Sequence, residues 1–374
     1  MDILSEKHQA TISLKPESAD ACVDWRMLFA PVRHELQRVD DILKSELVNA
    51  DPFVDEMLQH ARSLGGKRLR PALLLLVAKS LGGITDEHLT LAVVIEMIHA
   101  ATLVHDDILD GASQRRHKPT LNSIWGNESS VLVGDYLFSR SFFLASSLQT
   151  THACREIGKA TTIVCEGEMR QIGSCANFSL GEDEYLKIIE AKTAALCASA
   201  TYLAACYAKP VGGAVNEDKP TNGKTSNGHA SNSQIGKTHS LSDRMEEFRE
   251  YGRLLGIAFQ ITDDVLDIVG SENCVGKSLG TDLQQLKPTL PLIHLLQNLE
   301  LSERDRVVHA LETNQAGIFD EIRDAMFAHG SIEYATQRAE DHADAARNIV
   351  RDLHGNEATV ALQRIPKFVV QRQR

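Results

Sequence analysis

The sequence predicts an all-α fold in a single large helical domain. Apolar residues recur with helical periodicity through almost the whole chain, and convincing strand alternation is absent. Two stretches, residues 86–111 and 182–208, are apolar over most of their circumference, which predicts helices in the middle of a bundle. The chain has 374 residues, of which 43% are hydrophobic, so it can bury a substantial core.

The predicted helices follow one another with short connections, and several begin at a plausible capping residue such as Thr85, Ser302 or Ser331. In chain order they cover residues 22–48, 52–64, 70–81, 86–111, 129–149, 152–173, 182–208, 243–270, 286–299, 303–313, 317–329, 331–354 and 356–364. Residues 1–21 are expected to be a mobile start, and residues 22–374 the helical domain.

One segment of this domain, residues 209–242, has a different composition. It is rich in Gly, Ser, Asn, Thr and Lys and has few apolar residues, so burial cannot compensate for the entropy of ordering it. We expect a disordered surface insert. A docking or regulatory loop is the alternative.

Charge and composition limit the classes of function. The net charge of −12 argues against nucleic acid as a partner, and it means that an anionic substrate needs local cations or a metal. The seven cysteines are odd in number and lack CxxC spacing, which fits reduced thiols in the cytosol. Residues 1–25 lack the features of a signal or transit peptide, and Glu96 and His99 interrupt the longest apolar run. We therefore expect a soluble, cytoplasmic protein.

The helix predicted at 86–111 ends in three carboxylates, Asp106, Asp107 and Asp110. At about 3.6 residues per turn, Asp106 and Asp110 lie on one face, and Asp107 lies roughly 100° round the helix. Two stacked carboxylates repel each other unless a cation lies between them, and oxygen ligands favour Mg²⁺. The first and last aspartates are the natural metal ligands, although a single such cluster is more often a solvated helix end.

A second cluster makes the metal interpretation the stronger one. Asp263, Asp264 and Asp267 close another apolar helical stretch, FQITDDVLDIVG. Two clusters of this kind predict a cavity in which several Mg²⁺ ions grip a diphosphate.

Basic residues accompany both clusters. GGKRLRPAL places Lys67, Arg68 and Arg70 at the start of a helix, where backbone N–H groups favour anions. The remaining cations of interest are Arg115, Arg116 and Lys118 after the first cluster, Lys192 beside Thr193 on a small apolar helix face, and Lys277 and Lys287 after the second cluster. An anion bridged by Mg²⁺ and clamped by these side chains fits the pattern.

Other motifs are excluded by their context. Gly276-Lys277-Ser278 resembles part of a P-loop, but Ser271 stands where that motif requires Gly, and a helix precedes it. Glu96 and His99 have the ExxH spacing of di-iron bundles without the partner motif. His99 is interpreted as a polar group on the cavity side, with a satisfied core histidine as the alternative.

Six ordered motifs resemble those of the all-E polyprenyl diphosphate synthases: GGKRLRP, HDDILD, RRHKPT, the Lys192-Thr193 pair, FQITDDVLD and GKSLGTDLQQLKPTLPLI. The resemblance runs from about residue 30 to the C-terminus, apart from the insert. It implies a bundle of antiparallel helices around a deep apolar cavity, a homodimer, and two aspartate-rich motifs that face each other at the cavity mouth. It also implies Mg²⁺-dependent elongation of an allylic prenyl diphosphate with isopentenyl diphosphate, and transient membrane contact for product release.

The resemblance also assigns roles to residues. The catalytic set would be Asp106, Asp107, Asp110, Lys192, Asp263 and Asp264, with Mg²⁺ on Asp106, Asp110 and Asp263. The allylic diphosphate would contact Arg115, Lys192, Thr193, Gln260 and Lys277. Isopentenyl diphosphate would be bound by Lys67, Arg70, His99 and Arg116. His117 departs from the family, in which Gly often follows the two arginines.

Product length is expected to depend on residues below the first aspartate. Short-chain members typically have a bulky aromatic residue four or five positions before it, whereas Thr102 and Ala101 are small here. An open tunnel and a long product are predicted, with Phe142 and Phe143 as candidates for its floor and quinone side chains as the expected use. Close helix packing is the other explanation for the small residues.

Three other functions remain open alternatives. The nearest is a short-chain synthase that makes farnesyl or geranylgeranyl diphosphate. A class I terpene cyclase normally carries a different second metal motif, and the basic residues Lys67 and Arg70 would be redundant in it. A non-catalytic subunit typically loses aspartates, whereas both clusters are intact here.

Overall fold

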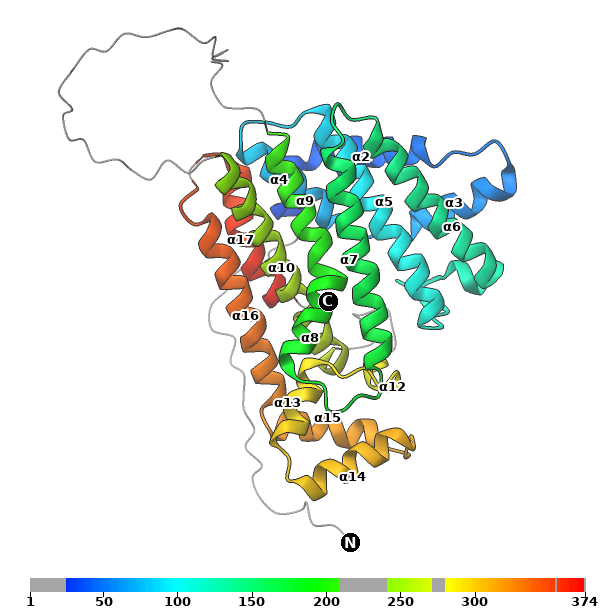
Figure 1. Cartoon of the computed structure of the whole chain (residues 1–374), viewed down its shortest axis with the longest axis vertical. Coiled ribbons are helices and arrows are strands. Elements are labelled where there is room, and N and C mark those ends of the chain that lie inside the picture. The colour runs from blue at the N-terminus through cyan, green and yellow to red at the C-terminus, as the bar shows by residue number, and fades with distance from the viewer. Residues whose placement is uncertain (1–24, 209–240, 271–279, 354, 373–374) are drawn as a thin grey trace, which may run out of the picture.

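The computed structural model describes residues 25–208, 241–270, 280–353 and 355–372, which form a bundle of long helices with a smaller helical cluster at one end (Figure 1). This confirms the predicted all-α fold. The strands among the described residues form one two-stranded antiparallel ribbon, β1 (Gln114–Arg115) with β2 (Lys118–Pro119).

The helices of the N-terminal half are α1 (Trp25–Leu28), the 3₁₀ turn η1 (Ala30–Val32), α2 (Arg33–Glu46), α3 (Pro52–Ser63), α4 (Leu69–Ser80), α5 (Asp86–Leu109), α6 (Leu121–Ser146) and α7 (His152–Ser174). Then come α8 (Glu182–Ile189), the π-helical segment η2 (Glu190–Ala194), α9 (Ala195–Cys206) and α10 (Leu241–Val269). The C-terminal helices are α12 (Thr281–Gln284), α13 (Leu290–Asn298), α14 (Leu301–Glu312), α15 (Ile318–Ala328), α16 (Ser331–Val350) and α17 (Glu357–Gln371).

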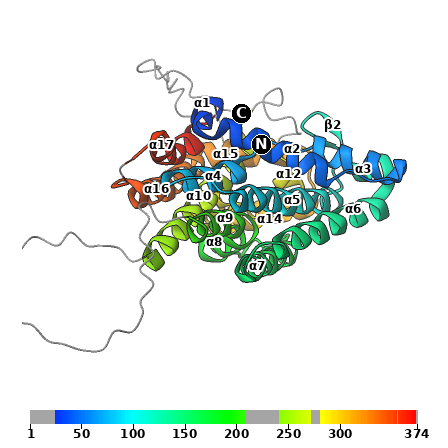
Figure 2. The same ribbon diagram turned by 90° about the horizontal axis from the view of Figure 1, so that it is seen from above.

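The main core contains residues of the two stretches that the sequence predicted to be central, and also α4, which was not predicted to be central. Residues of α4, α5 and α9 are buried on almost all sides, and α5 lies beside α6 (Figure 2). A second apolar cluster joins α8 and the end of α10 to α13–α16. The two aspartate-rich helix ends lie near the region where these cores meet.

Helix α5 resembles a membrane span in length and apolarity, and it is the one such helix among the described residues. Of the 18 residues in its most apolar stretch, 67% are buried inside the protein. A core helix of a bundle has the same composition, so this feature follows from the fold.

Several predicted helix boundaries are wrong, each for a local reason. The helix predicted at 22–48 is divided into α1, η1 and α2, with Pro31 in the first turn of η1. Helix α6 begins at Leu121, before the predicted 129, and bends at Gly126, which has a φ of 81°. Helix α17 continues to Gln371 through the buried Pro366, beyond the predicted end at 364.

Candidate active site

The central cavity lies at the end of α5. It has a volume of about 180 Å³, and Asp106 and Asp110 both line it, as expected for residues one turn apart. The other charged groups at its wall are Arg115, from the hairpin just after α5, and Lys192, Asp264, Asp282 and Lys287, from more distant parts of the chain. The cavity therefore brings carboxylates and cations together around one small space.

Helix α10 supplies the facing wall through Gln260 and Asp264. Asp264 is buried and accepts hydrogen bonds from Tyr185 Oη at 2.7 Å and Gln260 Nε2 at 2.8 Å. Asp263, the residue that we expected to hold metal, is not among the lining residues and forms an ion pair with Arg372. In this structure Asp264 is thus the residue of the pair that faces Asp106.

Asp107 points away from this cavity and holds the loop that follows α5. Its carboxylate accepts hydrogen bonds from Arg115 Nε at 2.9 and 3.1 Å, and Arg115 Nη2 lies 2.8 Å from Oδ1. A two-pronged pair of this kind fixes the orientation of the guanidinium. Asp107 therefore holds the Arg115 side chain in place at the wall of the cavity.

Lys192 is presented by the π-helical segment η2 rather than by regular α-helix. Its Nζ lies 2.9 Å from Glu168 Oε2, 2.8 Å from Gln171 Oε1 and 3.8 Å from Asp106 Oδ2. Gly167 permits this close crossing, because a Cβ there would come within 2.6 Å of the Lys192 amide nitrogen. Such π-helical turns often occur at functional sites.

Thr193, next to Lys192, is buried. Its hydroxyl donates a hydrogen bond of 2.7 Å to Gln260 Oε1. This bond joins η2 to α10, and Gln260 in turn donates to Asp264. The pair predicted from sequence, Lys192 and Thr193, thus connects α7, η2 and α10 at the cavity.

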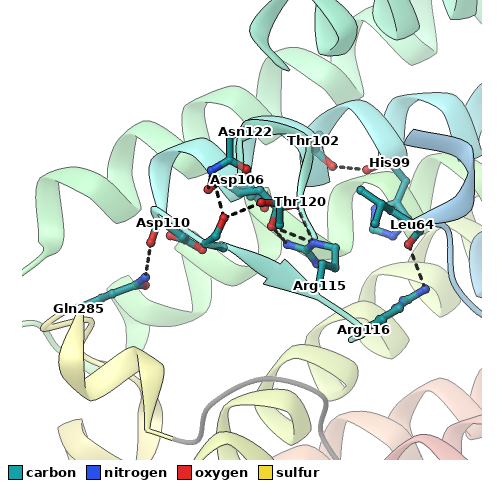
Figure 3. A network of polar contacts seen from close by, with 12 residues as sticks. Leu64, His99, Thr102, Asp106, Asp110, Arg115, Arg116, Thr120, Asn122 and Gln285 are labelled. Carbon is teal, nitrogen blue, oxygen red and sulfur yellow. Dashed lines mark hydrogen bonds and ion pairs between the residues drawn. The ribbon is translucent and has the colours of Figure 1, made fainter. Parts of the chain in front are cut away.

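Lys287, from the segment between α12 and α13, forms an ion pair with the first aspartate cluster. Its Nζ lies 2.9 Å from Asp110 Oδ1, and Gln285 donates to the Asp110 carbonyl at 3.3 Å (Figure 3). Lys277, the other predicted cation of this stretch, lies outside the described residues.

A second, smaller cavity adjoins the first. Its lining includes Gly65, Glu96 and His99, and it shares Arg115 and Leu103 with the central cavity. Arg70 lies close enough to His99 to lower its pKa and bonds to Cys197. Its Nε is buried and has no hydrogen-bond partner among the described residues, so it can take an additional acceptor. Arg116 reaches the same region, where Nη1 is 3.5 Å from the Leu64 carbonyl (Figure 3).

Electrostatics differ between the two cavities. Burial, reinforced by repulsion from Asp110, raises the pKa of Asp106, and burial and then Asp282 raise the pKa of Asp264 well above its usual value. Burial, together with Arg70, Arg115, Arg116 and Arg68, lowers the pKa of His99 well below its usual value. The carboxylates of the central cavity therefore favour an added cation, whereas the field at His99 is positive.

Carboxylate oxygens are the ligands that hard divalent cations prefer, so the donor set around the central cavity fits Mg²⁺. No three acidic, histidine or cysteine side chains among the described residues already form a metal cluster. Asp110 and Asp263 are instead ion-paired with Lys287 and Arg372. The donors are present, but cationic side chains hold them.

The chain-length residues lie below the cavity. Ala101 is buried in the main core, and Thr102 donates to the His99 carbonyl at 2.8 Å (Figure 3). Phe142 packs partly buried against the same core. Phe143 is 59% exposed, so the expectation that it forms the tunnel floor is wrong for a single copy of the chain: it lies on the outer face of α6.

The residues at the site that sequence reasoning missed include Glu168 and Gln171 on α7, Tyr185 on α8, and Asp282 on α12. The GEMRQ stretch on α7 contained a usable signal, because Glu168 and Gln171 lie on one helix face three residues apart. Asp282 lies within the motif GKSLGTDLQQLKPTLPLI, although it was not singled out there. Nothing in the local sequence connects Tyr185 with the cavity.

A family model described as polyprenyl synthetase matches residues 51–218 and 215–326 of this chain. The chain belongs to the polyprenyl synthetase family. This assignment confirms the resemblance that the six motifs indicated, and with it the prediction of a prenyltransferase.

Relatives of this synthetase cover nearly the whole chain. An octaprenyl diphosphate synthase from Escherichia coli is 34% identical over 88% of this chain and 93% of its own length. A short chain isoprenyl diphosphate synthase from Methanothermobacter thermautotrophicus is 30% identical over 90% of this chain and 94% of its own length.

The fold is shared with solved prenyl synthases. A polyprenyl synthase from Caulobacter crescentus, solved with calcium and isoprenyl diphosphate, superposes with a TM-score of 0.82. It is 29% identical, and the match covers 95% of this chain and 99% of that one. This confirms the isoprenoid synthase fold for the synthetase described here.

Proposed function

We propose that this protein condenses an allylic prenyl diphosphate with isopentenyl diphosphate and extends an all-E chain to a long polyprenyl diphosphate. The observation that carries the proposal is the pair of adjoining cavities. The central cavity combines carboxylates with cations. The second is a small space of about 10 Å³ beside His99, and Arg115 lines both. The positive field at His99 comes from Arg70, Arg115, Arg116 and Arg68.

The allylic diphosphate binds in the central cavity. The residues that would hold Mg²⁺ are Asp106 and Asp110 from α5 and Asp263 from α10. Asp264 is fixed at the wall by Tyr185 and Gln260. For Asp263 to bind a metal ion, its ion pair with Arg372 would have to break. Arg115, Lys192, Thr193, Gln260 and Lys277 are assigned to the diphosphate oxygens.

Isopentenyl diphosphate binds beside it through Lys67, Arg70, His99 and Arg116. The unpartnered Arg70 Nε supports an anion there. The lowered pKa of His99 supports it too, because the same positive field that keeps this imidazole neutral attracts a diphosphate.

Ionisation of the allylic carbon–oxygen bond needs strong stabilisation of the departing diphosphate. Mg²⁺ supplies part of this stabilisation by neutralising the developing charge. Lys192 and Arg115 supply the rest from fixed positions, because Glu168, Gln171 and Asp107 already orient them. The allylic carbon then bonds to the double bond of isopentenyl diphosphate, and the departed diphosphate takes the proton that is lost.

A long product is favoured over a short one. The residues four and five positions before Asp106 are Thr102 and Ala101, so no aromatic ring stands there to stop a growing chain. The octaprenyl relative supports this choice, and the short-chain relative at similar identity keeps the farnesyl- or geranylgeranyl-forming alternative as an outcome of the assay.

A homodimer is part of the proposal. Six large apolar side chains are exposed on α6 and α7: Ile124, Val131, Leu132, Phe143, Met169 and Ile172. Exposed apolar groups gathered on two adjacent helices are typical of an interface between protein subunits. We assign this α6–α7 face to a second copy of the chain.

A product assay tests the function. Purified protein is incubated with Mg²⁺, labelled isopentenyl diphosphate and farnesyl diphosphate, and the dephosphorylated products are sized by chromatography and mass spectrometry. Products of about seven or more isoprene units support a long-chain enzyme. A product that stops at four isoprene units would support the condensation chemistry and contradict the open tunnel. No incorporation of isopentenyl diphosphate would contradict the proposed function.

Asp106→Ala should abolish turnover and leave the helical circular dichroism unchanged, because Asp106 lies at the cavity wall rather than in the core packing. Loss of charge stabilisation at a reacting centre typically lowers the rate by about 10²–10³-fold or more. Asp86→Ala, at the exposed start of the same helix, is the matched control and should retain activity. Retained activity in Asp106→Ala would contradict the assignment.

A further inference from the structure

One of the three cations in the GGKRLRP segment is engaged inside the protein. Arg68 Nε donates to Asp40 Oδ1 at 2.9 Å, and its Nη1 forms an ion pair with Glu96. The Arg68 side chain is 16% exposed and that of Glu96 is 3% exposed. Arg68 thus joins α2, α5 and the start of α4.

The backbone of Arg68 is held in an unusual conformation. Its φ is 55° and its ψ 38°, in the left-handed region that L-residues with bulky side chains seldom adopt. It is also the residue that immediately precedes α4, and its carbonyl accepts the hydrogen bond of the Ala72 amide. The direction in which the chain enters α4 is therefore set at this residue.

The two glycines before this turn make room for guanidinium groups. A Cβ at Gly65 would come within 2.9 Å of Arg68 Cζ, and a Cβ at Gly66 would come within 2.5 Å of Arg116 Cζ. Side chains at either position would displace an arginine. The Gly65-Gly66 pair thus lets Arg68 fold back towards Glu96 while Arg116 lies beside the same loop.

The charge of this group indicates what it can and cannot do. Arg68 is one cation between two carboxylates, so the three side chains together offer no attraction to a diphosphate. Lys67 and Arg70, on either side of it in the chain, are the residues assigned to isopentenyl diphosphate. Glu96 itself lines the second cavity beside His99, so an unpaired carboxylate there would repel an anionic substrate.

We propose that Arg68, clamped by Glu96 and Asp40, is a positioning residue that fixes the turn before α4 and so aims Lys67 and Arg70 at isopentenyl diphosphate without touching it. This rests on the proposed function of the second cavity. It also gives a reason for the ExxH spacing on α5, since Glu96 holds the turn and His99 borders the substrate.

The test measures isopentenyl diphosphate binding directly by calorimetry with EDTA present, and separately the KM values of both substrates with Mg²⁺. Asp40→Ala is the decisive variant, because Asp40 lies on α2, is 41% exposed and lines neither cavity. We expect it to weaken isopentenyl diphosphate binding by about threefold, which corresponds to about 0.7 kcal/mol. If Arg68 touched the substrate directly, removing a competing carboxylate would leave binding unchanged or tighter.

The double variant Arg68→Met/Glu96→Gln removes the clamp without leaving a buried carboxylate unpaired, which would endanger folding. It should weaken isopentenyl diphosphate binding by about tenfold, or about 1.4 kcal/mol, and leave the KM of the allylic substrate within twofold. Arg68→Lys should show a smaller loss, since one ammonium cannot bridge both carboxylates in the same geometry.

Arg140→Met is the matched control, because Arg140 forms a comparable bridge to Glu46 at 2.6 Å and lines neither cavity. Unchanged binding in Asp40→Ala, or equal losses for both substrates in the double variant, would overturn the proposal. A wild-type protein that binds isopentenyl diphosphate without turning it over would contradict the proposed function and leave the positioning role standing.

Discussion

Asp106 and Asp107 are adjacent in the chain and have opposite surroundings. Asp106 lines the cavity, where Lys192 Nζ is 3.8 Å away, and its pKa is raised by burial. Asp107 is 2% exposed and receives two hydrogen bonds from Arg115. One carboxylate is available to a substrate or ion, and the other orients a cation that lines both cavities.

His99 makes the stability of the protein depend on pH at the residue scale. Burial and four arginines depress its folded-state pKa, whereas in the unfolded chain the pKa is about 6.5. Its contribution to stability is therefore full above pH 6.5 and is lost as the pH falls below that value towards the folded-state pKa. At pH 5.5 the loss should be at most about 1.4 kcal/mol.

His99→Gln should remove this contribution, so its free energy of unfolding should fall less between pH 7.5 and 5.5 than that of the wild type. Denaturant titrations at the two pH values measure the difference. His294→Gln, whose pKa is also lowered by burial but which is paired with Ser331 away from the site, is a suitable comparison. If the free energy of unfolding depended on pH identically in His99→Gln and in the wild type, the inferred lowering of the His99 pKa would be contradicted.

At the scale of elements, the β1–β2 hairpin determines where the two arginines after α5 point. Arg115 pairs with Lys118, which leaves a two-residue loop of Arg116 and His117 with φ values of 53° and 60°. Both loop residues have positive φ, as the primed hairpin turns require. The turn therefore forms with His117 in a left-handed conformation, which is unfavourable for a residue other than glycine.

His117→Val should lower the free energy of unfolding by about 1–2 kcal/mol, because a β-branched residue resists the left-handed conformation. His117→Gly should be neutral or slightly stabilising, since it relieves the strain but increases the entropy of the unfolded chain. Thermal and denaturant unfolding measure both. Gln114→Val, on β1 of the same hairpin, is the control, and an equal effect of the two valines would refute the strain argument.

Helix α5 is expected to set product length through the residues one to two turns below Asp106. Ala101 lies about 7.5 Å along the helix from it. Ala101→Phe should shorten the product by several isoprene units, and Ala101→Leu should have an intermediate effect. Product sizing gives the result, and thermal unfolding checks for overpacking, which typically costs about 1–3 kcal/mol. A folded Ala101→Phe with an unchanged product distribution would contradict the tunnel.

At the scale of the whole molecule, the α6–α7 face predicts self-association. Leu132, one of the apolar residues of this face, is 68% exposed. Leu132→Asp should convert a dimer to monomers in light scattering, because an interfacial carboxylate would be buried without a partner. Val360→Asp, at an exposed position on α17, should leave the dimer intact. A wild-type monomer, or a Leu132→Asp dimer, would refute this interface.

The sequence by itself determined the elements and the chemistry. Helical periodicity placed α5, α7 and α10 nearly to the residue, since one buried face repeats every 3.6 residues whatever the partner is. The same periodicity put Asp106 and Asp110 on one face and Asp107 off it, as the cavity lining confirms. Ordered motifs then indicated the family, because metal-assisted diphosphate chemistry requires carboxylates and cations that are visible in the sequence.

Only the tertiary structure decided which charges meet. Periodicity gives the angle between two residues on a helix but not the rotation of that helix against its neighbours, so it could not tell Asp263 from Asp264 as the residue at the wall. Distant segments supply a partner to each of three site residues: Gln171 to Lys192 from 21 residues away, Tyr185 to Asp264 from 79, and Lys287 to Asp110 from 177. Arg68 is the clearest case: its sequence neighbours suggest a substrate-binding cation, and packing against Glu96 and Asp40 gives it an internal role.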